Sequence, residues 1–273
     1  MATPRLYSKF DETSGILALD SSGHGLTGTL HSDFGEGPIN FADSSLYSDG
    51  AYGNYVQYPE GACSITGDLT ITLRFKPILV PYFASKTMQW LVIKQPSTGY
   101  HYHRTYSLGL GTILGGVMLV PMFWVGRPDA TGWLCEILSN VPVSLDEWHF
   151  IAVKRNAATG AAKMQVDNTW FDADIAEAGP ANLWPVPSEI PLHVAGGNWQ
   201  TVGHTTFRSF GGYMKELQIY DSVLTDDEIE EIFYGTPLPI VTPEVEYDRA
   251  LDTLASSVRV GTWRNQRTMR GRR

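Results

Sequence analysis

Residues 210–233, FGGYMKELQIYDSVLTDDEIEEIF, decide the fold because a β-strand in them runs through a tight turn into a capped helix. From residue 213 to residue 220 the side chains alternate, with apolar Leu217 and Ile219 on one face. The opposite face of this strand then carries Glu216, Gln218 and Tyr220. Alternation with a period of two is what a half-buried strand requires, so we expect a sheet strand here.

A short helix is predicted to begin directly after Thr225. The Thr225 hydroxyl can act as the N-cap, and Glu228, three residues further on, completes a capping box. Asp226 and Asp227 place negative charge at the positive end of the helix dipole. The apolar residues that follow at helical spacing are Ile229, Ile232 and Phe233. We therefore expect one helix that buries a single apolar face.

The beginning and middle of the chain contain four further stretches in a recognisable order. They are SKFDETSGILALDSSGHGLTGTL (8–30), NYVQYPEGACSITGDLTITLRFKP (54–77), SLDEWHFIAVKRNAATGAAKMQVDNTWF (144–171) and LHVAGGN (192–198). Together with the closing stretch they resemble laminin G-like domains of the concanavalin A-like jelly-roll superfamily. The resemblance covers about residues 5–235 and implies an all-β, two-sheet antiparallel jelly-roll sandwich. It predicts a domain of residues 1–235, with Leu69, Ile71, Leu73 and Phe75 facing its interior.

The composition agrees with an all-β protein of many short strands. The chain has 27 Gly, 16 Pro and 12% aromatic residues, and its β-branched and aromatic runs are separated by turn-forming residues.

Residues 106–126, YSLGLGTILGGVMLVPMFWVG, carry no charge and are long enough to span a bilayer. Five Gly and Pro121 interrupt this run, which favours buried strands. Gly111 and Gly115 form only a weak GxxxG signal in a chain so rich in glycine.

The first residues, MATPRLYSKF, contain no apolar segment of the kind found in secretory signal peptides. Cys63 and Cys135 are the two cysteines of the chain, and we expect buried free thiols rather than a disulfide. A laminin G-like domain without a signal peptide suggests a virus particle, because coat proteins assemble in the host cytoplasm. The predicted location is therefore the virion, with an extracellular location as the alternative.

The remaining residues, 236–273, are predicted to form a Pro-rich linker and a basic C-terminal arm. Residues 259–273 hold six of the 20 basic residues and no acidic one, a formal charge of +6. The preceding 258 residues carry fourteen basic against 29 acidic groups, a formal charge of −15. Such an asymmetry predicts an acidic partner for the arm. The predicted contacts are Trp263, Arg264, Arg267, Arg270, Arg272 and Arg273.

Catalysis is not expected from the sequence. Glucanases of the superfamily use closely spaced carboxylates of the form Glu-x-Asp-x-x-Glu on one strand, and no such string occurs here. No Gly-rich phosphate loop is present, no Ser/His/Asp arrangement is singled out by sequence, and no cofactor is predicted. His101 and His103 form an alternating pair without an evident third metal ligand, so no metal site is predicted.

The resemblance also raises the calcium site found in many laminin G-like relatives. Asp20 of the opening loop is kept, but Lys215 stands where the closing-strand aspartate is expected and His24 where Asn is common. An ammonium group cannot ligate Ca²⁺, so we expect an absent or crippled site in which Lys215 pairs with Asp20.

These features favour a non-enzymatic binding module, foremost a phage or viral surface protein such as a head decoration or fibre component. Its predicted partners are protein subunits, through self-association or a capsid or tail protein, with nucleic acid and membranes not expected. The alternatives are a carbohydrate-binding lectin or adhesion domain and a divergent glycoside hydrolase. Possible glycan contacts are Tyr100, Tyr102, Asn198 and Trp199.

Overall fold

The structure is a computed structural model, and it describes most of the chain up to residue 235. The described ranges are 2–32, 38–51, 53–78, 88–94, 105–113, 118–127, 132–181, 191–197 and 207–235. The chain divides into two compact units, residues 1–229 and residues 230–273. The predicted arm, residues 236–273, lies outside the described ranges, so its boundary with the domain stays a prediction.

The first unit is a sandwich of two sheets, as predicted. Apart from one parallel pair, β17 with β8, all strand pairings are antiparallel. The first sheet, sheet A, runs in the order β14 (Thr169–Asp172), β13 (Ala162–Val166), β12 (His149–Arg155), β7 (Leu69–Pro77), β18 (Gly211–Tyr220), β5 (Ser45–Asp49) and β4 (Ile39–Ala42), and β1 (Leu6–Ser8) also pairs with β18.

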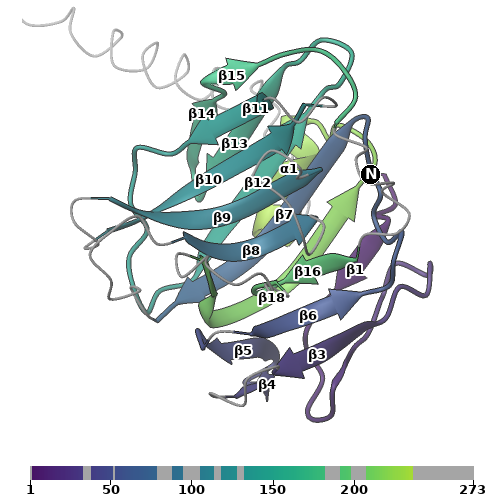
Figure 1. Ribbon diagram of the computed structural model, residues 1–273, viewed down its shortest axis with the longest axis vertical. Coiled ribbons are helices and arrows are strands. Elements are labelled where there is room, and N and C mark those ends of the chain that lie inside the picture. The colour runs from purple at the N-terminus through teal and green to yellow at the C-terminus, as the bar shows by residue number, and fades with distance from the viewer. Residues whose placement is uncertain are drawn as a thin grey trace, which may run out of the picture. The chain divides into compact units, whose positions relative to one another are not determined.

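Sheet B forms the other layer. Its order is β15 (Ile175–Ala176), β11 (Trp133–Leu138), β10 (Met118–Gly126), β9 (Tyr106–Ile113), β8 (Met88–Lys94), β16 (Leu192–Val194), β6 (Asn54–Tyr58), β3 (Gly28–Ser32) and β2 (Leu17–Ala18), with β17 (Phe207–Ser209) beside β8. In Figure 1, strands β10, β9, β8, β16, β6 and β3 lie side by side in front of β7 and β18. The uncharged run 106–126 is thus the β9–β10 pair, as its glycines and proline predicted.

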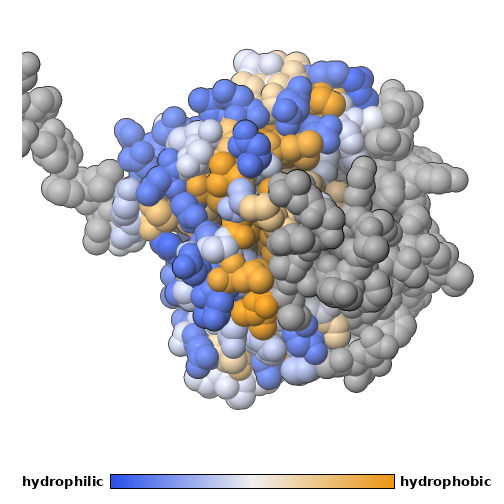
Figure 2. Space-filling model, turned by 90° about the vertical axis from the view of Figure 1, so that its left-hand side faces the viewer, coloured by the Kyte–Doolittle hydropathy of each residue, from blue (hydrophilic) through white to orange (hydrophobic). Residues whose placement is uncertain are grey.

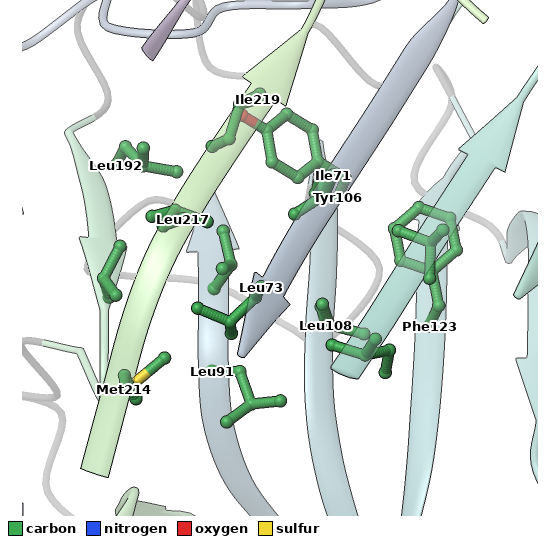
Figure 3. Packing of buried hydrophobic residues seen from close by; sticks show 14 of the residues in the cluster. Ile71, Leu73, Leu91, Tyr106, Leu108, Phe123, Leu192, Met214, Leu217 and Ile219 are labelled. Carbon is green, nitrogen blue, oxygen red and sulfur yellow. The ribbon is translucent and has the colours of Figure 1, made fainter. Parts of the chain in front are cut away.

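The core lies between the sheets. Leu69, Ile71, Leu73 and Phe75 of β7 are all buried, which confirms the predicted inward face. Figure 3 shows Ile71 and Leu73 with Leu217 and Ile219 of β18, opposite residues of sheet B such as Leu91 and Leu108. Full burial of one such side chain contributes about 1.5–3 kcal/mol.

A β-bulge in β18 changes the predicted alternation. Lys215 pairs with Arg74 and Gln218 with Thr72, so two residues of β18 face one residue of β7 between these pairs. Glu216 occupies the bulge with φ 56°, in the left-handed region that non-glycine residues rarely adopt. The strict alternation expected from residue 213 onward is therefore wrong before Leu217. The bulge directs Met214 into the core and Lys215 to the outer face of sheet A.

Helix α1 (Asp226–Tyr234) begins where the sequence predicted. The Thr225 N–H donates to Glu228 Oε2 at 2.9 Å, and the Glu228 N–H donates to Thr225 Oγ1 at 3.2 Å, which completes the capping box. Within the described ranges no helix has the length and apolar composition to cross a bilayer.

Cys63 and Cys135 are buried free thiols, as expected, and burial raises the pKa of each to about 12.

Candidate functional site

Every glycan, histidine and arm residue chosen from the sequence lies outside the described ranges. This holds for the possible glycan contacts Tyr100, Tyr102, Asn198 and Trp199, for the histidines His101 and His103, and for Trp263, Arg264, Arg267, Arg270, Arg272 and Arg273 of the arm. The described residues nonetheless offer a candidate site that sequence reasoning missed, on the outer face of sheet B.

The aromatic face, as we call it, is a second hydrophobic cluster separate from the core. It consists of buried Trp90, Ile93 and Trp124 together with partly buried Met88, Met122 and Trp133. The rings of Trp90 and Trp124 meet edge to face with centroids 5.9 Å apart. Large rings outside the sandwich core are unusual for mere strand packing and are typical of binding surfaces.

Two glycines of β9 make room for this cluster. Leu108 and Leu110 belong to the core, so Gly109 between them faces outward, opposite Trp90 of β8. A Cβ on Gly109 would lie 2.7 Å from the Gln89 carbonyl oxygen and 2.9 Å from the Trp90 ring. The glycine-rich run that interrupted the apparent membrane span therefore has a specific function in packing.

The accessible edge of the aromatic face combines rings with a carboxylate. Trp133, which is half-buried, lies 6.1 Å from Trp124 with the ring planes tilted by 39°. The Trp124 Nε1–H donates to Glu136 Oε1 at 3.0 Å, which fixes the ring and the carboxylate relative to each other. Ser107 lies opposite Trp124 in the strand register and is buried, and its hydroxyl has no hydrogen-bond partner within the described ranges.

The same face continues onto β6, β16 and β3 through three further rings. The His31 ring stacks on Tyr55 at 4.9 Å, and the His193 ring meets Tyr55 edge-on at 5.0 Å. Burial, followed by the charges of His31 and Lys94, lowers the pKa of His193 to about 4, so this imidazole is neutral at pH 7. The outer face of sheet B thus continues as a row of rings that includes one neutral imidazole, His193.

A second arrangement, Ser144, His149 and Asp167, has the geometry of a catalytic triad. His149 Nδ1 lies 2.8 Å from Asp167 Oδ2, and His149 Nε2 lies 3.1 Å from Ser144 Oγ. The sequence did not single out these three residues, although all of them lie in the stretch 144–171 that carries part of the family resemblance. Their contacts decide whether the serine can act as a nucleophile.

The contacts favour a structural role for Ser144, His149 and Asp167, which we call the clamp. His149 Nε2 is also 3.1 Å from the Ser144 carbonyl oxygen, which can only accept, so this nitrogen carries a proton. The Ser144 hydroxyl donates to Glu147 Oε2 at 2.5 Å and is not aimed at a free base. The hydrogen bond to Asp167 raises the pKa of His149, as expected for an imidazolium that donates from both nitrogens.

Asp20 of the opening loop is held by hydrogen-bond donors. Its carboxylate accepts the N–H groups of Tyr7 (3.1 Å), Ser22 (2.9 Å) and Leu26 (3.0 Å) and the Ser22 hydroxyl (2.8 Å). Burial raises the pKa of Asp20, but these hydrogen bonds outweigh it and the net pKa is lowered. The carboxylate therefore organises the loop.

The predicted pairing of Lys215 with Asp20 is wrong. The Lys215 ammonium lies 4.6 Å from the centroid of the Trp148 ring, and no ion pair joins it to Asp20. The bulge at Glu216 explains the difference, because it sets the direction of the Lys215 side chain. Among the residues that the structure describes, no group of three or more His, Cys, Asp or Glu side chains is placed to hold a metal ion.

One group of exposed apolar side chains lies at the end of β11 and in its connection to β12. Leu138, Val141, Leu145 and Trp148 are each 41–43% exposed. Figure 2 shows apolar side chains in a band on one side of the molecule, with hydrophilic surface to the left of the band. Exposed apolar patches with a polar surround are a general mark of binding surfaces.

The comparisons with known proteins agree with this architecture. A family model described as the concanavalin A-like lectin/glucanases superfamily matches residues 49–230. No curated protein matches the sequence.

Solved structures with the same fold include domain 4 of AbnA, a GH43 extracellular arabinanase from Geobacillus stearothermophilus, in complex with arabinotriose. It is 17% identical with a TM-score of 0.54, over 85% of this chain and 98% of that one. A Trypanosoma rangeli sialidase aligns at 11% identity and a TM-score of 0.54, over 85% of this chain and 33% of that one. The binding domain of botulinum neurotoxin serotype D/C aligns at 12% identity and a TM-score of 0.55, over 85% of this chain and 52% of that one. At these identities the similarity shows a shared fold.

We predict that Gly109→Ala destabilises the protein by about 1–3 kcal/mol, because the new methyl group overlaps a backbone carbonyl and a fixed ring. Gly111→Ala is the matched control, since its Cβ would meet only the flexible end of Met122. Urea unfolding followed by tryptophan fluorescence measures both. Equal losses in the two variants would contradict the assigned role of Gly109.

The His149–Asp167 pair predicts a pH-dependent stability. The folded pKa of His149 is raised, so its stabilisation is present below the unfolded pKa near 6.5 and is lost as pH rises through the folded pKa. Burial raises the pKa of Asp167, but hydrogen bonds from His149 and from the Phe150 N–H lower it overall, so its stabilisation is lost only as pH falls below about 3.9. Urea midpoints of the wild type should therefore decrease from pH 6 to pH 8.

The control is Asp167→Asn, which should be less stable at pH 6 and should show a smaller decrease over the same range. Parallel pH curves for the two proteins would show that the pair does not titrate as the geometry indicates.

Proposed function

The chain belongs to the concanavalin A-like lectin/glucanase superfamily, and we propose that it is a non-catalytic carbohydrate-binding module that uses the aromatic face of sheet B. The observation that carries the proposal is the accessible edge formed by half-buried Trp133 and Glu136, which pack beside buried Trp124. The indole ring of Trp133 offers apolar area to the C–H face of a sugar, and the Glu136 carboxylate, fixed by Trp124, accepts its hydroxyl groups.

The electrostatics of this face suit an uncharged sugar. His193 is neutral at pH 7. Arg127, which donates through Nε to the Trp133 carbonyl oxygen at 3.2 Å, is neutralised by an ion pair with Glu177. The domain of AbnA with a similar fold was solved with arabinotriose, and a neutral pentose oligosaccharide is accordingly a reasonable first probe.

We propose binding without hydrolysis because the carboxylates at this edge have structural partners. Glu136 accepts from Trp124, Glu177 pairs with Arg127, and Asp174 Oδ2 accepts the Leu138 N–H at 3.0 Å. Glycoside hydrolysis requires one carboxylate free to act as acid and a second as nucleophile or base.

Neutral oligosaccharides, including arabinotriose, should bind the wild type in glycan-array and calorimetric measurements. Trp133→Ala and Glu136→Gln should each weaken that binding about tenfold, equivalent to 1.4 kcal/mol. Trp170→Ala, which removes an indole from sheet A, is the control and should bind as the wild type does. Failure of the wild type to bind any neutral glycan, or unchanged binding by Trp133→Ala, would contradict the proposal.

Attachment to a larger particle through the arm is a second proposal. It rests on the formal charge of +6 in residues 259–273 against −15 in the rest of the chain, which favours contact between the arm and an acidic surface. Protein subunits of a virion, including further copies of this chain, would provide such a surface.

Deletion of residues 259–273 should leave the melting temperature of the sandwich nearly unchanged and abolish self-assembly. Differential scanning fluorimetry and size-exclusion chromatography with light scattering measure the two properties. Unchanged assembly by the truncated chain would show that the arm does not mediate self-assembly. A much lower melting temperature would indicate that the arm stabilises the domain itself.

A further inference from the structure

The outer face of sheet A carries a feature that neither the fold nor the proposed glycan site explains: cations placed over aromatic rings. Five such pairs occur within the described ranges, and all of them use residues on or beside this sheet. They are Lys9 with Tyr7, Arg74 with Phe150, Lys76 with Tyr213, Lys154 with Trp170, and Lys215 with Trp148. Three of the five cations are also paired with carboxylates: Arg74 with Glu216, Lys76 with Asp146 and Lys154 with Asp226.

Two of these pairs join a lysine to a tryptophan, and they differ in whether the lysine also has a carboxylate partner. Lys154 Nζ lies 5.1 Å from the Trp170 centroid, and its charge is already neutralised by an ion pair with Asp226. Lys215 Nζ lies 4.6 Å from the Trp148 centroid, and no carboxylate lies within 4 Å of it in the described part of the chain. An ammonium group has three N–H donors, and a ring face engages at most one of them. Lys215 therefore retains donors for an external acceptor.

The indoles of the two pairs differ in exposure. Trp148 is 42% exposed, whereas Trp170 is partly buried. Trp148 therefore offers ring area beside an ammonium group that has no internal counterion. An aromatic surface next to a cation matches a sugar ring that bears a carboxylate.

The backbone beneath Lys215 is held in a strained conformation that presents it outward. Glu216 adopts φ 56°, and this bulge is fixed by Arg74 Nε, which donates to Glu216 Oε2 at 2.7 Å. The Glu216 N–H also donates to the Lys9 carbonyl oxygen at 3.2 Å. Strain that is retained by specific contacts is a recurrent mark of functional positions.

We propose that Lys215 and Trp148 form a binding site for a carboxylate-bearing polysaccharide. The Lys215 ammonium pairs with the carboxylate, and the sugar ring lies against the indole of Trp148. Nearby Lys76 is paired with Asp146 at 2.7 Å and Arg74 with Glu216, so these two cations already have counterions and few cations of the face remain unpaired. Such a face suits a polymer with sparse charges better than nucleic acid, which has one charge per ~1.7 Å of helix axis.

The site is independent of the aromatic face, because it lies on the other sheet and uses other residues. It adds the recognition of an acidic glycan to the proposed recognition of a neutral one. The two proposals can therefore fail separately.

The test is native affinity electrophoresis of the full chain in gels that contain polygalacturonate, polysialic acid, or polygalacturonate whose carboxyl groups have been reduced. Polygalacturonate or polysialic acid should retard the wild type, and the one that does so identifies the source of the carboxylate. Lys215→Gln and Trp148→Ala should each lower the affinity about tenfold, the effect of a single charge-assisted contact. The reduced polymer should show no dependence on Lys215.

Two control variants separate this site from general effects. Lys163→Gln removes the same charge from an exposed position of β13, and Trp170→Ala removes the indole of the neutralised pair. Both should bind within about twofold of the wild type, since long-range surface charge is screened beyond ~10 Å at 0.1 M salt. Circular dichroism confirms that each variant is folded.

Several results would overturn the proposal: no retardation by either acidic polymer, equal weakening in Lys163→Gln and Lys215→Gln, or stronger binding of duplex DNA with the same dependence on Lys215. Loss of neutral-glycan binding in Trp133→Ala with unchanged retardation in polygalacturonate would support two separate sites. Loss of retardation in Trp133→Ala as well would overturn their independence.

Discussion

The pairing of β18 with β7, and the bulge within it, is the constraint on which the rest of the structure depends. These strands lie at the centre of sheet A, although about 140 residues separate them in the sequence. Glu216 is the extra residue, and it lets Met214, Leu217 and Ile219 all enter the core. Without it, strict alternation would turn Lys215 inward and Met214 outward. Hydrophobic burial and the placement of a surface cation thus have one common cause.

The two outer faces differ because glycine and charge are distributed differently over the two sheets. On sheet B, Gly109 makes space for an indole, and the resulting face is aromatic, with the Glu136 carboxylate at its edge. On sheet A, basic residues alternate with inward apolar ones along β7, and their side chains lie over rings from neighbouring strands. The same sandwich core can therefore support two chemically distinct surfaces, which is a common property of folds that host many functions.

Local patterns in the sequence were sufficient to predict the elements whose geometry depends on neighbouring residues. The capping box of Thr225 and Glu228, the inward face of β7 and the strands within residues 106–126 all follow from spacing and turn chemistry. The bulge at Glu216 could not be predicted in this way, because its contacts with Arg74 and Lys9 come from distant segments. Buried Lys94 shows the same limit: its ammonium donates to the Ala62 carbonyl oxygen at 2.8 Å, a contact that no local pattern indicates.

The candidate sites were beyond sequence reasoning for a related physical reason. Trp90, Trp124 and Trp133 are distributed over three strands, and only the register of β8, β9, β10 and β11 brings them onto one face. In the clamp, the pairing of β12 with β13 brings His149 beside Asp167, and the carbonyl acceptor at Nε2 shows why such geometry alone does not make a nucleophile. In a sandwich, function depends on which side chains the register places next to each other. A single bulge or glycine therefore determines the available chemistry as directly as the identity of the residues in contact with a ligand.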